Sequence, residues 1–558
     1  MGATGPGDAG DAGADAGLAA AKAAIVAGWE RTRARIEAVP RPPNVGALMD
    51  EAVERYGDRV AWSFFERGES VTFREAQAMS RRAASAFRAL GIGTGDRVAL
   101  MLPNGSAFLA GMLGLARLGA VVVPVNGRYG AREVAHVLAT SAAKALVYDP
   151  AHAIVVDGLA AEGRDVGALR ALVSEDGSGT AWADLVAAAE ELEADAAVDE
   201  TDLLSIQFTS GTTGFPKGCM LTHRYWINAA VSWTGYIELP VERFLCNQKL
   251  FYLDGQYNAL HCLHRGATFY CCSKPSGSKF LGWVREHRID NAFYFDPLFT
   301  APRTPQDADN ELKLLSIFGF SPRRHAELEE RYGCIARESY GMTEFAPSLI
   351  MPLDADAMVG SGSCGLPAPF TELKIADEAG REVPRGEVGE LWVRSPAMMA
   401  GSCADPEATA AVLAGGWLHT GDLFRQDEAG FYYIVGRTKD MIRRNAENVA
   451  CVEVEAILRL MPEIREAALV PVPDEVVGEE IKAYVQLMPG LTPDDVPPER
   501  ILAFCAEQLA PFKVPRYLAY RDGFPMTESA RVEKKKLTAG VADLTLGAYD
   551  RVAGAWRS

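Results

Sequence analysis

Hydrophobic and polar positions alternate along the first third of the chain in the pattern of an α/β protein. Residues 45–56 place their apolar side chains on one helical face, and Thr72 with Glu75 forms a capping box that begins a further helix. Helices are also predicted at residues 107–118 and 131–140, between short apolar runs that predict buried strands at residues 97–102, 120–125 and 145–148. Strands and helices that alternate at this spacing predict a parallel, helix-covered sheet.

The same alternation predicts how the rest of the chain divides. After about residue 365 the sequence becomes rich in predicted strands, which indicates a β-rich subdomain, and past Arg437 a smaller α+β unit begins. With 558 residues the chain is too long for one ordinary core. We therefore expect a disordered Gly/Ala/Asp-rich tail over residues 1–17, a large domain over residues 18–436 that begins with an Ala-rich helix, and a small mobile C-terminal domain over residues 437–558.

Composition and charge exclude several classes of function. The net charge of -18 argues against nonspecific binding to nucleic acid, and no run of about twenty apolar residues predicts a membrane span. The ten cysteines show no CxxC spacing, which favours reduced thiols and a cytoplasmic location, and the eight histidines form no metal-ligand pattern. The composition leaves the oligomeric state open, a homodimer included.

The sequence TSGTTGFPKG at residues 209–218 follows an apolar run that predicts a buried strand at residues 203–208. Glycines let a backbone approach an anion closely, hydroxyl and amide groups donate hydrogen bonds to phosphate oxygens, and a lysine neutralises their charge. The spacing differs from a Walker A loop, because Gly218 stands where that motif has serine or threonine. The segment predicts a polyphosphate-binding loop, and a Gly/Thr-rich surface turn is the alternative.

Three further motifs follow the loop in order: ESYGMTE at residues 338–344, GWLHTGD at residues 416–422 and GRTKDMI at residues 436–442. With them the chain resembles the adenylate-forming superfamily of acyl-CoA synthetases, luciferases and adenylation domains, from about Asn44 to about Leu537. The resemblance implies an ATP-dependent carboxylic acid–CoA ligase that forms an acyl adenylate, releases pyrophosphate and then makes a thioester. ATP, Mg²⁺ and coenzyme A would be its cofactors, and a small carboxylic acid its substrate.

The resemblance also implies roles for individual residues. Lys217, Thr343, Glu344 and Arg531 would be catalytic, with Glu344 as the magnesium ligand, an oxygen donor of the kind that Mg²⁺ prefers. Tyr340 would stack on adenine and Asp422 would bind both ribose hydroxyls, with Arg437 beside them. The full set expected to bind ATP or AMP is Thr209, Ser210, Gly211, Thr212, Thr213, Gly214, Lys217, Gly319, Ser321, Tyr340, Gly341, Thr343, Asp422 and Arg437.

In the superfamily the small domain rotates between the two half-reactions, and Lys439 occupies the hinge position. Arg443 and Ala446 would lie near the path of coenzyme A, and Arg444 and Lys513 are further basic candidates. Two positions depart from the superfamily pattern: Ala446 replaces a glycine, and Arg531 replaces a lysine that bridges carboxylate and phosphate. Arginine keeps the charge but not the shape of lysine, so Lys534 and Lys535 are alternative bridging cations.

The acid-binding pocket is expected at Tyr252, Asp254, Tyr257, Tyr294 and Asp296. The surrounding sequence looks most like carnitine- and crotonobetaine-type CoA ligases. Aromatic rings and carboxylates suit an onium group through cation–π contact and charge pairing. The alternative interpretation is that these residues are ordinary core aromatics and turn aspartates.

Two other functions stay open at the level of sequence. The protein could adenylate an acid and load a separate carrier protein, or release the free adenylate. It could also be a catalytically weakened nucleotide-binding homologue, because of Arg531 and Ala446. Dependence on coenzyme A separates the ligase from the first alternative, and acid-dependent pyrophosphate release excludes the second.

Overall fold

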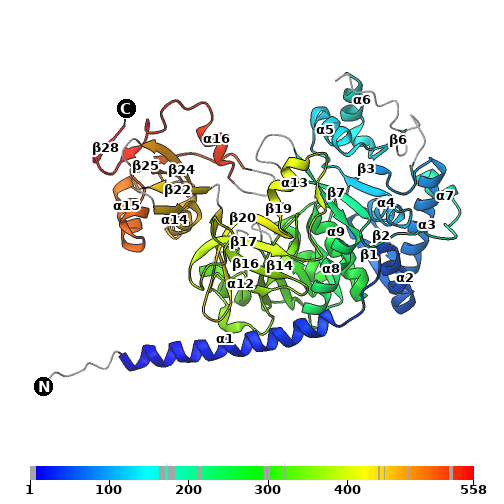
Figure 1. The fold of residues 1–558 in the computed structure, drawn as a ribbon, viewed down its shortest axis with the longest axis horizontal. Coiled ribbons are helices and arrows are strands. Elements are labelled where there is room, and N and C mark those ends of the chain that lie inside the picture. Colours follow the sequence, from blue (N-terminus) through cyan, green and yellow to red (C-terminus); the bar gives the residue numbers. More distant parts are fainter. Residues whose placement is uncertain are drawn as a thin grey trace. The chain divides into compact units, whose positions relative to one another are not determined.

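The computed structural model shows a chain that divides into two compact units (Figure 1). It describes residues 8–161, 170–173, 182–209, 216–294, 298, 302–319, 322–437, 440–444, 447–474, 477–526 and 532–557. The first unit contains residues up to Lys374, with Trp392–His419 and Asp427–Tyr432. The second contains Ile375–Leu391, Thr420–Gln426 and Tyr433–Ser558.

The first unit contains a sheet whose β3 to β7 are parallel, as the alternating pattern predicted, while β8 and β18 add antiparallel pairs. Among the described residues its order is β18-β8-β7-β4-β3-β5-β6, and β3 to β7 run parallel to their neighbours in that group. α4 lies against β3 and β4, and α3 packs on α4. The strands are β3 (Arg97–Met101), β4 (Val121–Pro124), β5 (Ala145–Tyr148), β6 (Arg170–Val173), β7 (Leu203–Thr209), β8 (Lys217–Thr222) and β18 (Gly401–Ser402), and the helices α3 (Phe73–Ala89), α4 (Ser106–Arg117), α5 (Ala131–Ser141), α6 (Ala153–Ala161), α7 (Trp182–Ala188) and α13 (Pro406–Val412).

A second sheet of this unit has the order β15-β14-β13-β12-β11-β9-β10-β1-β2 among the described residues. Its central strands are parallel, and antiparallel pairs close both edges. The strands are β1 (Val60–Phe64), β2 (Glu69–Thr72), β9 (Arg243–Cys246), β10 (Thr268–Cys271), β11 (Asn291–Phe293), β12 (Leu314–Ile317), β13 (Ile335–Met342), β14 (Ala346–Ile350) and β15 (Leu366–Pro367), with helices α2 (Val45–Tyr56), α10 (Gly277–Glu286) and α12 (His325–Tyr332).

Two buried helices connect the sheets. α8 (His223–Tyr236) contacts β8 of the first sheet and β14 of the second, and α9 (Leu253–Arg265) contacts α8, β1, β9 and β10. The Thr222 side chain caps α8 by accepting a hydrogen bond from the Tyr225 amide. Because both helices are buried along most of their length, most of the polar side chains that they carry face protein rather than bulk water.

A long helix, α1 (Asp8–Glu37), precedes this α/β core (Figure 1). The sequence predicted its beginning near residue 18 and a disordered tail before it, whereas the structure begins the helix at Asp8. Alanine has the highest helix propensity, and aspartate near a helix N-terminus interacts favourably with the helix dipole, so the Ala/Asp-rich residues 8–17 extend the helix. Ile25, Trp29 and Ile36 form its buried side.

The remaining strands form a sheet within residues 372–437 and the sheet of the second unit. One sheet has the order β16-β17-β20-β19 with β21 beside β20, and the sheet of the second unit has the order β23-β22-β25-β26-β27-β28 with β24 beside β25. These elements are β16 (Glu372–Ala376), β17 (Val388–Arg394), β19 (Leu413–Ala414), β20 (Trp417–Gln426), β21 (Tyr432–Arg437), β22 (Met441–Arg444), β23 (Glu447–Ala450), β24 (Ile464–Asp474), β25 (Gly478–Leu487), β26 (Tyr517–Tyr520), β27 (Tyr549–Asp550), β28 (Ala555–Trp556), α14 (Cys451–Leu458), α15 (Pro498–Gln508) and α16 (Lys534–Thr538). The predicted fold class, α/β with a separate C-terminal domain, is confirmed. In the described part of the chain, no helix combines the length and apolarity needed to cross a membrane.

Candidate functional site

The predicted phosphate loop connects β7 and β8, which pair as an antiparallel hairpin. Thr209 is the register partner of Lys217, and Phe208 is the partner of Gly218. The His136 ring lies 3.0 Å from the Pro216 carbonyl oxygen and so anchors the end of the loop. A Cβ atom on Gly218 would come within 2.8 Å of Ile206 Cγ2, so this position requires glycine. The predicted loop residues Ser210, Gly211, Thr212, Thr213 and Gly214 lie outside the described residues.

Lys217 follows the loop and is available to a ligand. Its side chain is 46% exposed, and its Nζ atom lies 3.9 Å from an Asp405 carboxylate oxygen whose side chain is also largely exposed. A pair of this length between exposed groups contributes little to stability. Binding an anion at Lys217 therefore costs the fold little.

Thr343 and Glu344 lie in the turn between β13 and β14. The Tyr225 hydroxyl donates to the Thr343 carbonyl oxygen at 3.0 Å, and the Met399 amide donates to the Glu344 carbonyl oxygen at 2.7 Å. Gly341 opposes Pro347 in this hairpin, and a Cβ atom on Gly341 would lie 2.6 Å from the Ala346 carbonyl oxygen. The backbone of the turn is therefore held on both sides, and only a glycine fits at its beginning.

Cys219 of β8 connects the two hairpins. Burial raises the pKa of its thiol, and the neighbouring Glu344 carboxylate raises that pKa further, while the Thr209 side chain forms a hydrogen bond with the thiol. The structure thus brings together Thr209, which begins the phosphate loop, and Glu344, the predicted magnesium ligand. Sequence reasoning did not identify Cys219, because a single buried cysteine carries no motif.

The donor set at Glu344 fits a magnesium ion that is also bound by nucleotide. Among the described residues no group of three His, Cys, Asp or Glu side chains could hold a metal by itself. Mg²⁺ is usually bound through one or two carboxylates together with substrate phosphates and water. A single carboxylate next to a phosphate loop is consistent with that arrangement.

The segment predicted to line the adenine begins at Gly319, and its backbone conformation there is one that favours glycine. Gly319 has a φ of +62°, a left-handed conformation that favours glycine, and its amide donates to a Glu338 carboxylate oxygen. The Tyr340 ring is 9% exposed and lies 5.8 Å from the Phe345 ring, centroid to centroid. Stacking of adenine on Tyr340 stays a prediction, and Ser321 lies outside the described residues.

Asp422 and Arg437, the predicted ribose site, are neighbours within the second unit. The Asp422 side chain is buried, and its Oδ1 atom lies 2.8 Å from Arg437 Nε. The preceding backbone is held by Thr420, whose hydroxyl accepts a hydrogen bond from the Asp422 amide at 3.0 Å and donates to the Leu391 carbonyl at 2.7 Å. The buried carboxylate therefore lies next to a cation whose side chain is 41% exposed.

Several predicted residues of the hinge and the coenzyme A path have no described geometry. Lys439, Ala446 and Arg531 lie outside the described residues, as does the side chain of Arg443. Three other basic candidates are ion-paired. Arg444 forms two bonds to Glu480 at 2.8 and 2.9 Å, Lys513 binds Glu453 at 2.7 Å, and Lys534 lies 2.7 Å from Glu455.

The predicted acid-binding residues gather at the beginning of α9. Water reaches the Asp254 side chain, yet surrounding protein withdraws it from bulk solvent and raises its pKa to about 6. The nearby charge of Asp254 also raises the pKa values of the buried Tyr225 and Tyr257 phenols, after the larger effect of burial. Asp254 thus lies within electrostatic range of the predicted pocket residue Tyr257 and of Tyr225, whose hydroxyl donates to the Thr343 carbonyl oxygen.

Of the remaining predicted pocket residues, Tyr252 is the N-cap of α9 and Tyr294 follows β11. Tyr252 is half-buried and its ring contacts Phe251 at 4.6 Å between centroids, and Tyr294 is half-buried at the end of β11. Asp296 lies outside the described residues. Gln256, at the end of the same predicted pocket segment, donates to Gln207 Oε1 at 3.0 Å and joins α9 to the strand before the phosphate loop.

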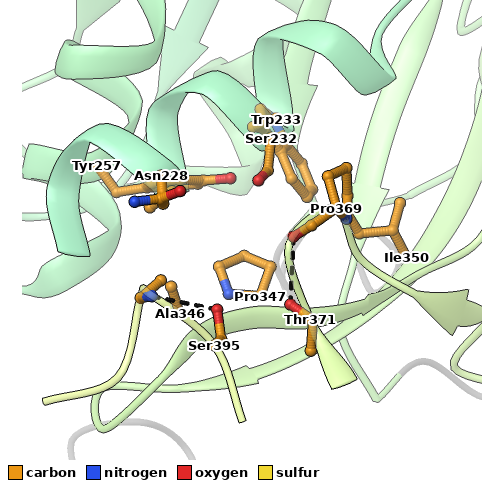
Figure 2. A pocket seen from close by; sticks show the side chains of 12 residues that line it. Asn228, Ser232, Trp233, Tyr257, Ala346, Pro347, Ile350, Pro369, Thr371 and Ser395 are labelled. Carbon is orange, nitrogen blue, oxygen red and sulfur yellow. Dashed lines mark hydrogen bonds between the residues drawn. The ribbon is translucent and has the colours of Figure 1, made fainter. Parts of the chain in front are cut away.

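A small cavity of about 10 Å³, the room of one water molecule, lies between α8, α9 and β14 (Figure 2). Tyr257, Trp233, Asn228 and Ser232 line one side, and Ala346, Pro347, Pro369, Thr371 and Ser395 line the other (Figure 2). Within the described structure, the buried Tyr257 hydroxyl and the buried Trp233 Nε1 have no hydrogen-bond partner. Sequence reasoning missed the α8 residues because Asn228 and Ser232 occur singly in an otherwise apolar helix.

Family models match most of the chain. Residues 49–402 match the model described as AMP-binding enzyme, and residues 453–531 match the AMP-binding enzyme C-terminal domain. The ATP-bound MatB from Rhodopseudomonas palustris is a similar solved structure, with 27% sequence identity and a TM-score of 0.80 over 88% of this chain and 98% of that chain.

Two relatives of similar sequence are named as a CoA synthase and a CoA ligase. A feruloyl-CoA synthase from an Amycolatopsis species is 35% identical over 476 residues, which cover 84% of this chain and 93% of the relative. A crotonobetaine/carnitine–CoA ligase from Citrobacter koseri is 32% identical over 519 residues, covering 88% and 98% respectively.

Proposed function

The chain belongs to the AMP-binding enzyme family, and from this premise we propose roles for its residues in a ligation whose acid carries a cationic or hydrogen-bonding group. The reaction class itself is established by the relatives: the protein is an ATP-dependent carboxylic acid–CoA ligase that works through an acyl adenylate. ATP, Mg²⁺ and coenzyme A take part in the reaction.

In the first half-reaction a carboxylate oxygen of the acid bonds to the α-phosphorus of ATP. The bond from the α-phosphorus to the bridging oxygen breaks, and its electron pair leaves with pyrophosphate. Both reactants are anions, so the site must reduce their repulsion and align them. We assign the β- and γ-phosphates to the hairpin loop with Lys217, and the α-phosphate to Thr343. Thr209 at the start of the loop and Glu344, the neighbour of Thr343, both lie beside Cys219.

Magnesium, held by Glu344 and by the phosphates, would supply positive charge at the leaving pyrophosphate. Asp422 would receive the ribose hydroxyls, with Arg437 released from its ion pair to interact with the nucleotide. In the second half-reaction the thiol sulfur of coenzyme A bonds to the acyl carbon, the C–O bond to AMP breaks, and AMP leaves.

The observation that carries the proposed acid class is the Asp254 carboxylate. It lies at the beginning of α9, one turn before the cavity-lining Tyr257, and the surrounding protein raises the pKa of its carboxyl to about 6. An acid with a quaternary ammonium group would pair with the ionised carboxylate and contact neighbouring aromatic rings. The crotonobetaine/carnitine–CoA ligase among the relatives is named for acids of this type.

A second candidate is a phenolic cinnamic acid, as in the name of the feruloyl-CoA synthase. The unpartnered Tyr257 hydroxyl favours it, because a methoxyl or hydroxyl oxygen entering the cavity would accept a hydrogen bond there. The free thiols of all ten cysteines, most of them buried, support the further proposal of a cytoplasmic location.

A panel of carboxylic acids tests the proposal directly. With ATP and Mg²⁺, pyrophosphate release is expected for betaine-type or cinnamic acids and is expected to rise when coenzyme A is added, because thioester formation removes the adenylate. Pyrophosphate release that does not change when coenzyme A is added would indicate transfer to a carrier protein. Preference for a short aliphatic acid would contradict both proposed acid classes.

Asp254→Asn distinguishes between the two acid classes. For a cationic acid, we expect kcat/KM to fall about 10- to 100-fold, since the charged partner of the onium group is lost. In the unchanged protein kcat/KM for that acid should fall as the pH drops below about 6, because the Asp254 carboxylate becomes protonated; in Asp254→Asn this step should disappear. A neutral cinnamic acid serves as the control, and an equal loss with both acids would show that Asp254 acts only on the fold.

A further inference from the structure

The segment from Arg33 to Arg41, at the end of α1 and just beyond it, contacts both sides of the cavity beside Tyr257. It precedes residue 49, where the match to the AMP-binding family model begins. We call residues 33–41 the strap. Its contacts are specific, and they reach the Pro369–Thr371 loop on one side and Asn228 of α8 on the other.

On the loop side, the strap holds a backbone conformation that is unfavourable by itself. Phe370 has a φ of +60°, in the left-handed region that residues with a side chain avoid. Its amide donates to Glu37 Oε1 at 2.7 Å, the Arg33 guanidinium donates to the Thr371 carbonyl at 3.2 Å, and the Arg41 guanidinium lies 5.0 Å from the centre of the Phe370 ring. Such conformations persist only where surrounding contacts impose them, and they occur frequently at ligand sites.

The loop that is held in this way forms part of the cavity wall. Pro369 and Thr371, on either side of Phe370, both line the cavity, where the Thr371 hydroxyl donates to the Pro369 carbonyl (Figure 2). The same side of the cavity also contains Ala346, which has a positive φ of +55° and follows Glu344 by two residues. Two strained backbone positions therefore border one small space next to the predicted adenylation residues.

On the helix side, the Arg41 guanidinium donates to Asn228 Oδ1. Asn228 is 2% exposed and lines the cavity, and its amide nitrogen donates to the Arg224 carbonyl at 2.7 Å. Both ends of the Asn228 amide are thus occupied, so Arg41 and the Arg224 carbonyl together hold the direction in which this side chain faces. A second strap residue, Ile36, packs so closely on α8 that a Cβ atom on Gly235 would lie 2.5 Å from it.

We propose that the strap determines acid selectivity: Glu37 and Arg41 are positioning residues that set the distance between the Pro369–Thr371 loop and Asn228, and so the shape of the cavity that receives part of the acid. This inference rests on the proposed role of the Tyr257 region as the acid site. The strap contacts none of the predicted ATP-binding residues that the structure describes. Changing the strap should therefore alter the KM for the acid and not the KM for ATP.

The test compares Glu37→Ala, Arg41→Ala and the matched control Lys22→Ala. Lys22 is on the same helix, where it pairs with Asp427 at 2.8 Å, away from the cavity. We expect the acid KM to rise about fivefold or more in both strap variants, with the ATP KM changed less than twofold, and neither constant changed in Lys22→Ala. Glu37→Gln keeps an acceptor oxygen for the Phe370 amide and should restore the acid KM.

Hydrogen exchange at the Phe370 amide provides a readout that needs no turnover: it should be faster in Glu37→Ala than in Glu37→Gln. If the Phe370 amide exchanges faster in Glu37→Ala but the order of preference among the acids and the KM for each acid stay the same, the proposal is overturned. The strap would then be only a stabilising element. A rise in acid KM in Lys22→Ala equal to that in Arg41→Ala would overturn it as well. Failure of the proposed acid class is recognised separately, since the unchanged protein would then prefer a short aliphatic acid, whereas failure of the strap inference leaves the acid preference of the unchanged protein as proposed.

Discussion

Glu344→Gln is expected to slow adenylate formation about 100- to 1000-fold, the range seen when one electrostatic group that stabilises a transition state is removed. Glutamine has nearly the same shape but no charge, so it would bind magnesium and the developing charge at the phosphates poorly. The turn itself should keep its structure, because it is held through backbone groups: the Glu344 carbonyl accepts from Met399, and the Thr343 carbonyl accepts from Tyr225.

Pyrophosphate release measured across a magnesium titration checks this prediction. The curve should move to higher magnesium concentration in Glu344→Gln and stay in place in a control such as Glu407→Gln, an exposed glutamate on α13. Thioester formation from a supplied acyl adenylate should be almost unaffected, because pyrophosphate has already left. An unchanged magnesium dependence would remove Glu344 from metal binding and leave it a role in the turn.

Asp422→Asn is expected to raise the KM for ATP about 100-fold. A hydrogen bond to a charged acceptor contributes about 1.5–3 kcal/mol, and one carboxylate would accept two from the ribose. Asparagine keeps the size of the side chain, and Arg437, which is 41% exposed, can be solvated when its partner is lost. The fold should therefore tolerate the change, and the loss should appear in nucleotide binding.

Nucleotide analogues that lack the ribose hydroxyls test this prediction most directly. The unchanged protein should discriminate strongly between ATP and 2′,3′-dideoxy-ATP, and Asp422→Asn should discriminate weakly, since the carboxylate that reads both hydroxyls is absent. Arg437→Ala, which removes the other half of the ion pair, is the matched variant and should keep the discrimination. If Asp422→Asn still preferred ATP strongly, Asp422 would have no contact with the ribose.

Much of the fold could be predicted from sequence because helices and strands depend on neighbouring residues. The capping box at Thr72 and Glu75 forms as predicted and begins α3 at Phe73. The helix predicted at residues 45–56 coincides with α2. The main difference, the early beginning of α1, concerns a segment whose alanines favour helix while its glycines and low complexity suggest disorder, and local patterns weigh these opposing tendencies poorly.

The candidate site shows where such local reasoning ends. Arg444 and Lys513 were basic candidates near the coenzyme A path and Lys534 an alternative bridging cation, and each is paired with a glutamate of its own unit. Whether a basic side chain is solvated, paired or free for a ligand depends on residues distant in sequence. Asp254 illustrates the reverse case, since only its surroundings raise its pKa.

By itself, the sequence determined the α/β class, the order of the elements and the chemistry of the motifs, because periodicity, capping and short glycine-rich loops are local properties. Only the tertiary structure decided which of these parts meet: Thr209 with Glu344 at Cys219, and the strap with the Phe370 loop and Asn228. Contacts between such distant residues arise from the packing of sheets and helices around a shared core, and no local pattern in the chain records them.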